Sequence, residues 1–424
     1  MRIRHAVPVL AIATPLAMLA PQVARAHTIY VGTCNPNANS VSTITQAISA
    51  VAPNGTIDIC PGTYAEQLTI TKSLKLVGVN PGPSNSSQVL IVPPAGGLLN
   101  NATDIDTNQP TAAQIAVQGA TVSISGLTVD GTGNGIGTYG CAWDVVGIIY
   151  QNASGTVSGN VVRNEFAAPF ASYGGCQSGL GIFVQTTTGS SNVVITKNAV
   201  ETYAKNGITG NDAGTNVTIS DNTVLGMGPT TGAGENSVQI GFGATGSVAG
   251  NIVGDDVWAL DVFGDTGDAA AGILVYDSAG VPITGNTVNS TQYAIAVVSD
   301  GGGSADHATI STNKVGVTYL YDAIDVCGAG SATISGNTLN ATDEAAIHLD
   351  SSCGAASTGN TVNNNKIDGA CAGILEGTGS GGPPGNNSVL NAANILLTGS
   401  DVCPVAESAK VHGGKHKAHF RPMR

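Results

Sequence analysis

A histidine accompanied by two carboxylates is the strongest candidate for chemistry in this sequence. The run Ala-Ile-His-Leu-Asp places His348 two residues before Asp350, and Asp325 lies in the related run Ala-Ile-Asp-Val one repeat earlier. Carboxylates beside an imidazole favour its charged form, and such a group can act as a general acid or base. We therefore predict Asp325, His348 and Asp350 as catalytic residues; the alternative is a solvated strand face, because structural ion pairs have the same composition.

These three residues belong to a short aliphatic phrase that recurs along the chain, as in GIIY, GIFV, SVQI, GILV, AIAV, AIDV and AIHL. If each phrase is a strand, alternate side chains point to the same side, and stacked strands present two outward columns. The first column includes Gln239, Asp325 and His348, and the second includes Gln185, Tyr276 and Asp350. We expect Gln185, Gln239 and Tyr276 to contact a ligand on this face.

A second phrase follows each of these strands and carries an asparagine behind a turn, as in ISGNTL. A bend at Gly336 would point Ile334, Asn337 and Leu339 inward, because glycine tolerates the required backbone conformation. A buried amide must find hydrogen-bond partners, and the asparagines of neighbouring repeats can supply them. The sequence therefore predicts a structural asparagine ladder made of Asn160, Asn198, Asn222, Asn251, Asn286, Asn313, Asn337, Asn360 and Asn387.

Two short strands cannot bury an apolar face alone, so the repeats must stack on one another. Stacked short strands with a repeat length of about 20 to 30 residues are typical of a β-helix. Parallel crossovers are right-handed in nearly all proteins. We predict an all-β, right-handed parallel β-helix of ten to eleven coils, with a short N-terminal helix at Ile44, Ala47, Ile48 and Val51 that caps the core.

Three connections are longer than the rest, at 163–181, 225–237 and 254–272. Long loops on a rigid solenoid usually carry the binding surface, so we expect them to form the deepest groove. The third contains Trp258, which could stack on a sugar ring, and several aspartates. Asp256, Asp261 and Asp265 could bind calcium there; the alternative is a solvated acidic loop.

The two ends of the chain differ from its body. Residues 1–26 have a basic start, an apolar stretch and the small-residue site Ala24-Arg25-Ala26, which predicts a secretory signal peptide. Residues 27–409 are predicted to form one β-helix domain, and 410–424 a disordered basic tail. We expect a secreted, cell-surface or periplasmic protein without a transmembrane segment, and a monomer.

The charge and cysteine composition of the chain limits the partners it could bind and indicates how its cysteines are used. The chain has 28 acidic and 15 basic residues and a net charge of −13, so its body would repel nucleic acid. The eight cysteines form no Cys-x-x-Cys pair, which favours disulfides in an exported protein. From the position of each cysteine in the repeat we predict four bridges, Cys34–Cys60, Cys141–Cys176, Cys327–Cys353 and Cys371–Cys403.

The N-terminal segment TITQAISAVAPNGTIDICPGTYAEQLTITKSLKLVGVN resembles the opening of pectin-lyase-like right-handed β-helix proteins, including the pectin methylesterases. With the asparagine repeats, the resemblance covers nearly the whole chain after the signal peptide. It implies binding or cleavage of an acidic polysaccharide. The sequence lacks the NTD, GHG and RIK runs of polygalacturonases, and only Leu260 to Gly264 is similar to a methylesterase motif.

Two hypotheses for function remain open at this point. The chain is either a secreted protein that binds or modifies an acidic polysaccharide as a lyase, esterase or epimerase, or a non-catalytic, adhesin-like surface scaffold. The uneven loops and the Asp325–His348–Asp350 cluster favour the first hypothesis. The low aromatic content of 4% and the missing motifs favour the second.

Overall fold

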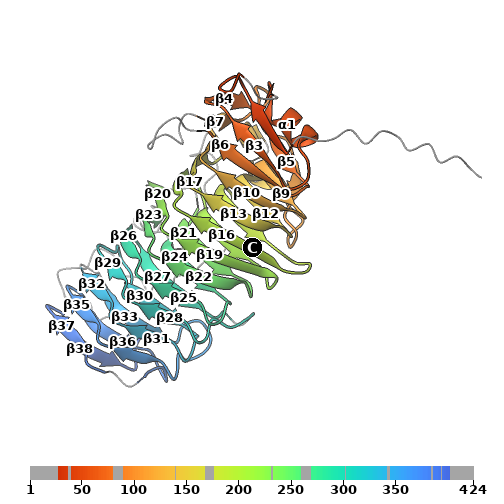
Figure 1. The fold of residues 1–424 in the computed structure, drawn as a ribbon. Coiled ribbons are helices and arrows are strands. Elements are labelled where there is room, and N and C mark those ends of the chain that lie inside the picture. The colour runs from red at the N-terminus through yellow and green to blue at the C-terminus, as the bar shows by residue number, and fades with distance from the viewer. Residues whose placement is uncertain are drawn as a thin grey trace, which may run out of the picture.

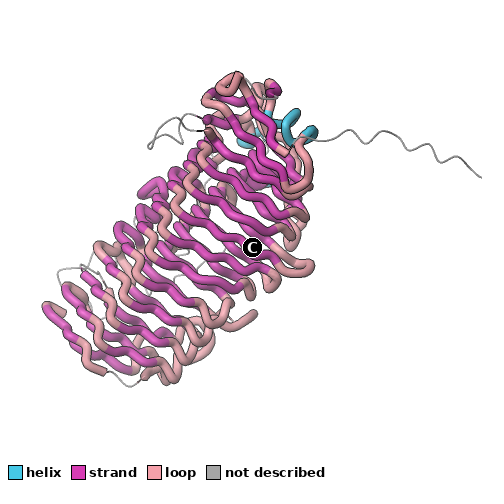
Figure 2. The backbone as a smooth tube through the Cα atoms, viewed as in Figure 1, coloured by secondary structure: helices cyan, strands magenta, loops and turns pink. Residues whose placement is uncertain are grey.

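The chain forms a right-handed parallel β-helix, a stack of coils in which each coil contributes one short strand to each of three sheets (Figure 1). A computed structural model describes residues 27–36, 40–79, 89–138, 140–167, 176–230, 233–258, 269–300, 302–340, 344–382, 385–392 and 394–401. The predicted signal peptide and basic tail lie outside these residues. Figure 2 shows the strands as successive rungs that run the length of the stack.

The strands are grouped by sheet. Sheet A contains β1 (Thr28–Val31), β2 (Ser40–Val41), β3 (Gly55–Ile59), β6 (Leu74–Gly78), β10 (Thr121–Ser125), β13 (Ser154–Ser158), β16 (Ser191–Thr196), β19 (Thr215–Ser220), β22 (Thr245–Ala249), β25 (Pro282–Thr284), β28 (Thr309–Ser311), β31 (Thr333–Ser335) and β34 (Thr361–Asn363). Sheet B contains β4 (Gly62–Ala65), β7 (Val89–Val92), β11 (Thr128–Asp130), β14 (Val161–Glu165), β17 (Ala199–Tyr203), β20 (Thr223–Thr230), β23 (Ile252–Trp258), β26 (Thr287–Thr291), β29 (Lys314–Val315), β32 (Thr338–Asn340), β35 (Lys366–Asp368) and β37 (Ser388–Leu390). Sheet C contains β5 (Leu68–Ile70), β9 (Pro110–Gln118), β12 (Asp144–Gln151), β15 (Leu180–Gln185), β18 (Asn206–Asn211), β21 (Asn236–Gly241), β24 (Ala271–Tyr276), β27 (Tyr293–Val298), β30 (Ile324–Cys327), β33 (Ala345–Asp350), β36 (Ala372–Glu376) and β38 (Asn394–Thr398), with β8 (Ala102–Thr103) antiparallel to β9.

The number of coils exceeds the predicted ten to eleven. Sheet B has 12 strands among the described residues, one for each coil. The asparagine phrase marks only part of the stack, because the first coils lack that phrase. Strands β4 and β7 enter sheet B without a ladder asparagine, so a count based on asparagine misses them.

The core is a column of Ile, Val and Leu side chains contributed by all three sheets. The predicted helix covers its N-terminal end as α1 (Ile44–Ala50), with Ile44 and Ala47 buried against β1 and β3. The side chain of Thr43 accepts a hydrogen bond from the backbone N–H of Gln46 and so caps the helix. No helix in the described part of the chain is long and apolar enough to span a membrane.

The asparagine ladder is confirmed for eight of the nine predicted positions. Asn251 shows the pattern: its Nδ2 donates to Asn286 Oδ1 at 3.0 Å, and its Oδ1 accepts from the backbone N–H and Nδ2 of Asn222. The residue before the ladder asparagine has a left-handed backbone at every ladder position from Asn160 to Asn365, as predicted for Gly336, whose φ is 68°. The turn and the amide column are therefore one repeated structural unit.

The assignment of Asn360 to the ladder is wrong, and Asn365 takes its place. Asn337 Nδ2 donates to Asn365 Oδ1, and Asn365 Nδ2 donates to Asn387 Oδ1. In the register of sheet A, Ile334 pairs with Val362. The true copy of ISGNTL is therefore VNNNKI, starting at Val362, and the similar-looking STGNTV lies one turn earlier. Asn360 instead accepts a hydrogen bond from the Ala332 N–H.

Three of the four predicted disulfides are present, Cys34–Cys60, Cys141–Cys176 and Cys327–Cys353. The last joins the ends of neighbouring coils, with the two α-carbons 5.6 Å apart. The proposed pairing of Cys371 with Cys403 falls on Cys403, which lies outside the described residues. The confirmed pairs show that the predicted positions of these six cysteines within the coils are correct.

Candidate functional site

Sheet C brings the predicted catalytic residues together. Asp325 of β30 pairs with His348 of β33, and Cys327 pairs with Asp350 in the same two strands. Both outward columns have the predicted register along the sheet, from Phe183 opposite Thr209 to His348 opposite Leu375. Adjacent strands are about 4.8 Å apart, so Asp325 and His348 are direct neighbours.

The outward columns are nevertheless not displayed to solvent, which corrects the sequence-based expectation. Gln185 is fully buried: its Nε2 donates to Asp104 Oδ2, and its Oε1 accepts from the Ile105 N–H. Gln239 is also fully buried, with its Nε2 donating to Asn211 Oδ1. A second layer of side chains covers much of this face, so these two glutamines act as buried hydrogen-bond partners.

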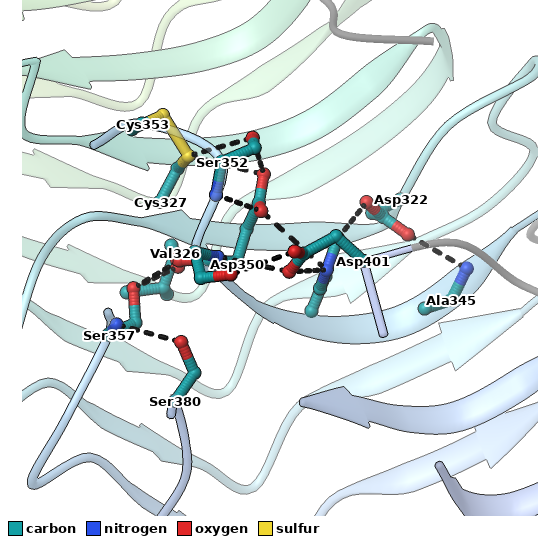
Figure 3. Close-up of polar contacts among 12 residues, drawn as sticks. Asp322, Val326, Cys327, Ala345, Asp350, Ser352, Cys353, Ser357, Ser380 and Asp401 are labelled. Atoms are coloured by element: carbon teal, nitrogen blue, oxygen red, sulfur yellow. Dashed lines mark hydrogen bonds and ion pairs between the residues drawn. A yellow bond between two sulfur atoms is a disulfide. The ribbon is translucent and has the colours of Figure 1, made fainter. Parts of the chain in front are cut away.

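His348 is only 4% exposed and lies among the carboxylates of Asp322, Asp350 and Asp401, which are labelled in Figure 3. Its Nδ1 is 3.0 Å from Asp322 Oδ2. Its Nε2 is 3.6 Å from Asp401 Oδ1 and 3.9 Å from Asp350 Oδ1, and has no hydrogen-bond partner. The imidazole is therefore bonded on one side and faces two carboxylates across a wider gap on the other.

Each carboxylate around His348 has its own hydrogen bonds, which fix its direction. Asp322 Oδ1 accepts from the Ala345 N–H, and Asp350 accepts from both the backbone N–H and the hydroxyl of Ser352. Asp401 accepts in the same way from the backbone N–H and hydroxyl of Ser351. The cluster is thus pre-organised before any ligand arrives.

The charges in the cluster are strongly coupled. Burial by itself lowers the pKa of His348, but the Asp322 carboxylate, with Asp401 and Asp325, more than offsets this and raises that pKa well above its usual value. Burial, followed by repulsion from Asp350, raises the pKa of Asp325 well above its usual range. The proximity of His348 lowers the pKa of Asp401. The surrounding carboxylates therefore favour the charged form of the His348 imidazole.

The cluster has the composition of an acid–base site but little access. The two clefts described below are lined by residues other than His348, Asp325 and Asp350. The catalytic role of the three residues remains a prediction.

Sequence reasoning missed two members of the cluster, Asp322 and Asp401. Asp322 precedes β30 and is outside the alternating part of that strand. Asp401 follows β38, and its contact with Ser351 crosses 50 residues. No periodic signal marks either position; only the excess of acidic residues near the C-terminal coils hints at them.

In the structure, the described residues of the predicted calcium loop are more buried than the sequence analysis expected. Asp256 is fully buried and accepts hydrogen bonds from Tyr203 OH at 2.7 Å and Ser237 Oγ at 2.5 Å. Asp261 and Asp265 lie outside the described residues. Trp258 is 5% exposed, so its ring is packed against the protein. Asp256 and Trp258 are therefore not open to a ligand in this arrangement.

A cleft formed by described residues lies at the loop around residues 300–304. It has a volume of about 730 Å³ and is lined by Phe242, Tyr276, Asp277, Asp300 and the loop residues Gly302, Gly303 and Ser304. Residues 168–175, 231–232 and 259–268 of the three long loops lie outside the described residues, so the expectation that these loops form the deepest groove stays a prediction. Tyr276, one of the predicted binding residues, does line the cleft.

The cleft is built where three strands of sheet C end. Phe242 follows β21, Tyr276 ends β24 with Asp277 after it, and Asp300 follows β27. The two rings are 5.4 Å apart between centroids and tilted by 50°. Tyr276 OH donates to Asp300 Oδ2 at 2.8 Å, and the Asp300 N–H donates to Asp277 Oδ1. Two rings and two carboxylates are thus fixed relative to one another.

A smaller cleft of about 470 Å³ opens along the same edge of the sheet, lined by Asn101, Thr103, Gln118 and Gln151 among others. Gln118 pairs with Gln151, which pairs with Gln185, and the same column continues to Tyr276. Gln151 and Tyr276 are four strands apart, or about 19 Å. The two clefts therefore follow the axis of the helix.

Comparison with known proteins agrees with this architecture. A family model described as "Periplasmic copper-binding protein (NosD)" matches residues 248–401, which is less than half of the chain. A search of curated proteins gives no match.

Solved structures with the same fold include the Dettilon tailspike protein, at 16% identity and a TM-score of 0.51, with 79% of this chain and 61% of that chain covered. The GH136 lacto-N-biosidase from Eubacterium ramulus has 11% identity and a TM-score of 0.50, with 88% of this chain and 66% of that chain covered. The catalytic domain of a GH87 alpha-1,3-glucanase in complex with nigerose has 14% identity and a TM-score of 0.50, with 89% and 69% covered. This chain thus spans less than two thirds of the tailspike.

Proposed function

We propose that this protein, a right-handed parallel β-helix with the pectin-lyase-like fold, binds a polysaccharide in the cleft formed by Phe242, Tyr276, Asp277 and Asp300. The observation that carries the proposal is that Phe242, which is half-buried, and Tyr276, which is mostly buried, line one cleft together with Asp277 and Asp300. The function is binding, because His348 and its carboxylates are too deeply buried to meet a polymer.

The chemistry of the cleft suits a sugar. Aromatic rings provide a rigid apolar face for the C–H side of a pyranose, and carboxylates accept hydrogen bonds from its hydroxyls. The hydrogen bond from Tyr276 to Asp300 fixes the tyrosine ring, so little conformational entropy is lost on binding. The smaller cleft along the same edge extends the surface, which favours a polymer over a single sugar.

The charge of the cleft bears on the class of polymer. Asp277 and Asp300 would repel a uronate, so a neutral glycan fits the cleft directly. The acidic polysaccharide implied by the family resemblance would require a bridging cation such as calcium between its carboxylates and these two aspartates. Two of the structures with this fold are named as a lacto-N-biosidase and an alpha-1,3-glucanase, which supports a glycan ligand of either kind.

The proposed location is the periplasm or the extracellular space. The signal-like sequence of residues 1–26 and the three disulfides support export, because disulfides persist in oxidising compartments. The description of the matching family as periplasmic points the same way.

Isothermal titration calorimetry against a panel of polymers tests the proposal. The panel contains neutral glucan oligosaccharides and polygalacturonate oligosaccharides, the latter with and without calcium. We expect one of these to bind, and Tyr276→Ala or Phe242→Ala to raise its Kd about tenfold, the worth of a lost aromatic contact. Tyr319→Ala, at an exposed tyrosine away from the cleft, is the matched control and should bind as the parent does.

Two outcomes count against the proposal. The first is that no polymer binds; the second is that both ring variants bind as tightly as the parent. A reducing-end assay on the same samples separates binding from cleavage. Release of reducing ends that disappears in His348→Asn would establish the enzyme hypothesis in place of a binding protein.

A further inference from the structure

We propose that His348 Nε2, Asp350 Oδ1 and Asp401 Oδ1 together bind one divalent first-row transition-metal ion. These donor atoms all lie within 4.8 Å of one another. The proposal concerns a different place from the glycan cleft and does not depend on glycan binding. It is carried by the spacing of the donors, by the orphaned imidazole nitrogen and by the way the imidazole is oriented.

The distances between the three donor atoms fit a shared metal ion better than direct hydrogen bonds. His348 Nε2 is 3.6 Å from Asp401 Oδ1 and 3.9 Å from Asp350 Oδ1, and both gaps are too wide for a hydrogen bond. Two donors that are each about 2.1 Å from one metal ion lie about 3.0 to 3.4 Å apart in octahedral or tetrahedral geometry. A shift of a few tenths of an ångström therefore closes the site around an ion.

The free nitrogen of His348 is the second observation. Nε2 is buried, has no partner within hydrogen-bond distance, and faces the carboxylate oxygens of Asp350 and Asp401. A buried polar atom without a partner is costly. An ion between Nε2 and the two carboxylates satisfies all three groups at once.

The environment of the other ring nitrogen is typical of a metal-binding histidine. His348 Nδ1 lies 3.0 Å from Asp322 Oδ2, and Asp322 is itself oriented by the Ala345 N–H. A carboxylate that accepts from one ring nitrogen fixes the tautomer and leaves the lone pair of the other nitrogen for a metal. Ser351 and Ser352 orient the two ligating carboxylates in the same manner (Figure 3).

The donor set selects the class of ion. One imidazole nitrogen and two carboxylate oxygens suit zinc, cobalt or copper(II) better than calcium or magnesium, which prefer oxygen alone. Asp325 has a buried oxygen without a hydrogen-bond partner beside His348 and could complete the coordination. Cys327 and Cys353 are joined in a disulfide, so they offer no thiolate. Such an ion would fix Asp401, which follows the last strand, to β33.

Zinc titration of the full chain tests the site. The tail histidines can also bind metal, so the parent for this experiment carries His412→Asn, His416→Asn and His419→Asn. We expect the chelator-treated parent to bind one equivalent of Zn²⁺, and Co²⁺ to give visible absorption bands in its place. Asp401→Asn, at a half-buried ligand whose loss the fold should tolerate, should weaken zinc binding at least tenfold.

Two further variants distinguish a specific zinc site from nonspecific attraction of the cation to acidic residues. Asp322→Asn leaves all three ligands in place and should weaken zinc binding about 10- to 100-fold, the usual cost of losing such a partner. His307→Asn, at an exposed histidine outside the cluster, should leave the affinity unchanged. Failure of the parent to bind zinc, equal affinity in parent and Asp401→Asn, or tighter binding of calcium than of zinc would each overturn the proposal.

Discussion

The asparagine ladder and the outer face of sheet C are both polar and buried, but they differ in how their polar atoms are satisfied. In the ladder, the amide of Asn251 bonds to the asparagines before and after it and to the Ile219 carbonyl. On and beside sheet C, Asp325 Oδ1, His348 Nε2 and an oxygen of Glu235 are buried without partners. An unpartnered buried group costs stability, so the outer face is not optimised for folding alone.

This difference teaches how to separate scaffold from site in a repeat protein. A residue that recurs in every coil is explained by the coil, and its environment is the same each time. His348 and Asp401 occur once, and their surroundings are repeated nowhere else in the described part of the chain. We therefore place the chemistry of the protein in the residues that break the repeat.

The largest effect is expected from breaking the ladder at its centre. Asn251→Ala removes, in a buried site, the partners of one of the two amide N–H groups of Asn222 and of the Asn222 backbone N–H, together with the Asn251 hydrogen bond to the Ile219 carbonyl. At about 1 to 3 kcal/mol for each unsatisfied group, the unfolding free energy should fall by roughly 5 kcal/mol. Urea unfolding followed by circular dichroism measures this.

The matched control is Asn216→Ala, because Asn216 is an exposed asparagine whose amide pairs with Asn192 on the surface. Its effect should stay within about 0.5 kcal/mol. A loss of less than about 1 kcal/mol for Asn251→Ala would mean that the ladder fills space without providing needed hydrogen bonds.

A smaller effect, and one that depends on pH, is expected at the edge of sheet C. Burial, followed by repulsion from Asp104, raises the pKa of Asp144 to about 7. The folded state therefore keeps the Asp144 proton where the unfolded state has lost it. Stability from this group is present at about pH 4 and is lost as the pH rises to about 7, by at most about 4 kcal/mol.

Asp144→Asn tests this by removing the titration, so the fall in unfolding free energy between pH 4 and 8 should be shallower than in the parent. Denaturant midpoints across this range give the comparison. Asp221→Asn, at an exposed turn, should keep the parent's profile. Parallel profiles for the parent and Asp144→Asn would show that Asp144 is ionised in the folded protein at low pH.

The smallest effect on stability is expected in the glycan cleft. Tyr276→Phe keeps the ring and loses only the hydrogen bond to Asp300, which should cost about 1 kcal/mol or less. Glycan affinity should fall by less than in Tyr276→Ala, because the stacking face remains. Thermal unfolding and calorimetry on the same samples measure both; a larger loss of affinity in Tyr276→Phe than in Tyr276→Ala would place the sugar contact on the hydroxyl.

The fold was predictable from sequence because each repeat is determined by interactions between residues close together in the chain. The left-handed turn before Asn337, the inward Ile334 and the cap at Thr43 all follow from neighbouring residues. The disulfide Cys327–Cys353 followed from the coil register. The one ladder error, Asn360 in place of Asn365, arose where two similar phrases adjoin and only the pairing of Val362 with Ile334 decides.

The site was less predictable because it depends on what covers the coils. Gln185 is covered by Asp104 and Ile105, about 80 residues earlier in the chain. Asp401 reaches His348 only because the chain passes back over sheet C after its last strand. Neither contact leaves a periodic trace. Tyr276 was predictable as an outward residue, but its partners Phe242 and Asp300 come from loops whose course the repeat does not specify.

A crystal structure of the protein with the tightest-binding oligosaccharide is the most direct test of the central claim, that the polysaccharide binds in the cleft at the ends of β21, β24 and β27. We predict electron density for a sugar ring stacked against Phe242 or Tyr276, with hydroxyls within hydrogen-bond distance of Asp277 or Asp300. Density for the oligosaccharide elsewhere on the molecule, with this cleft containing only solvent, would contradict the account.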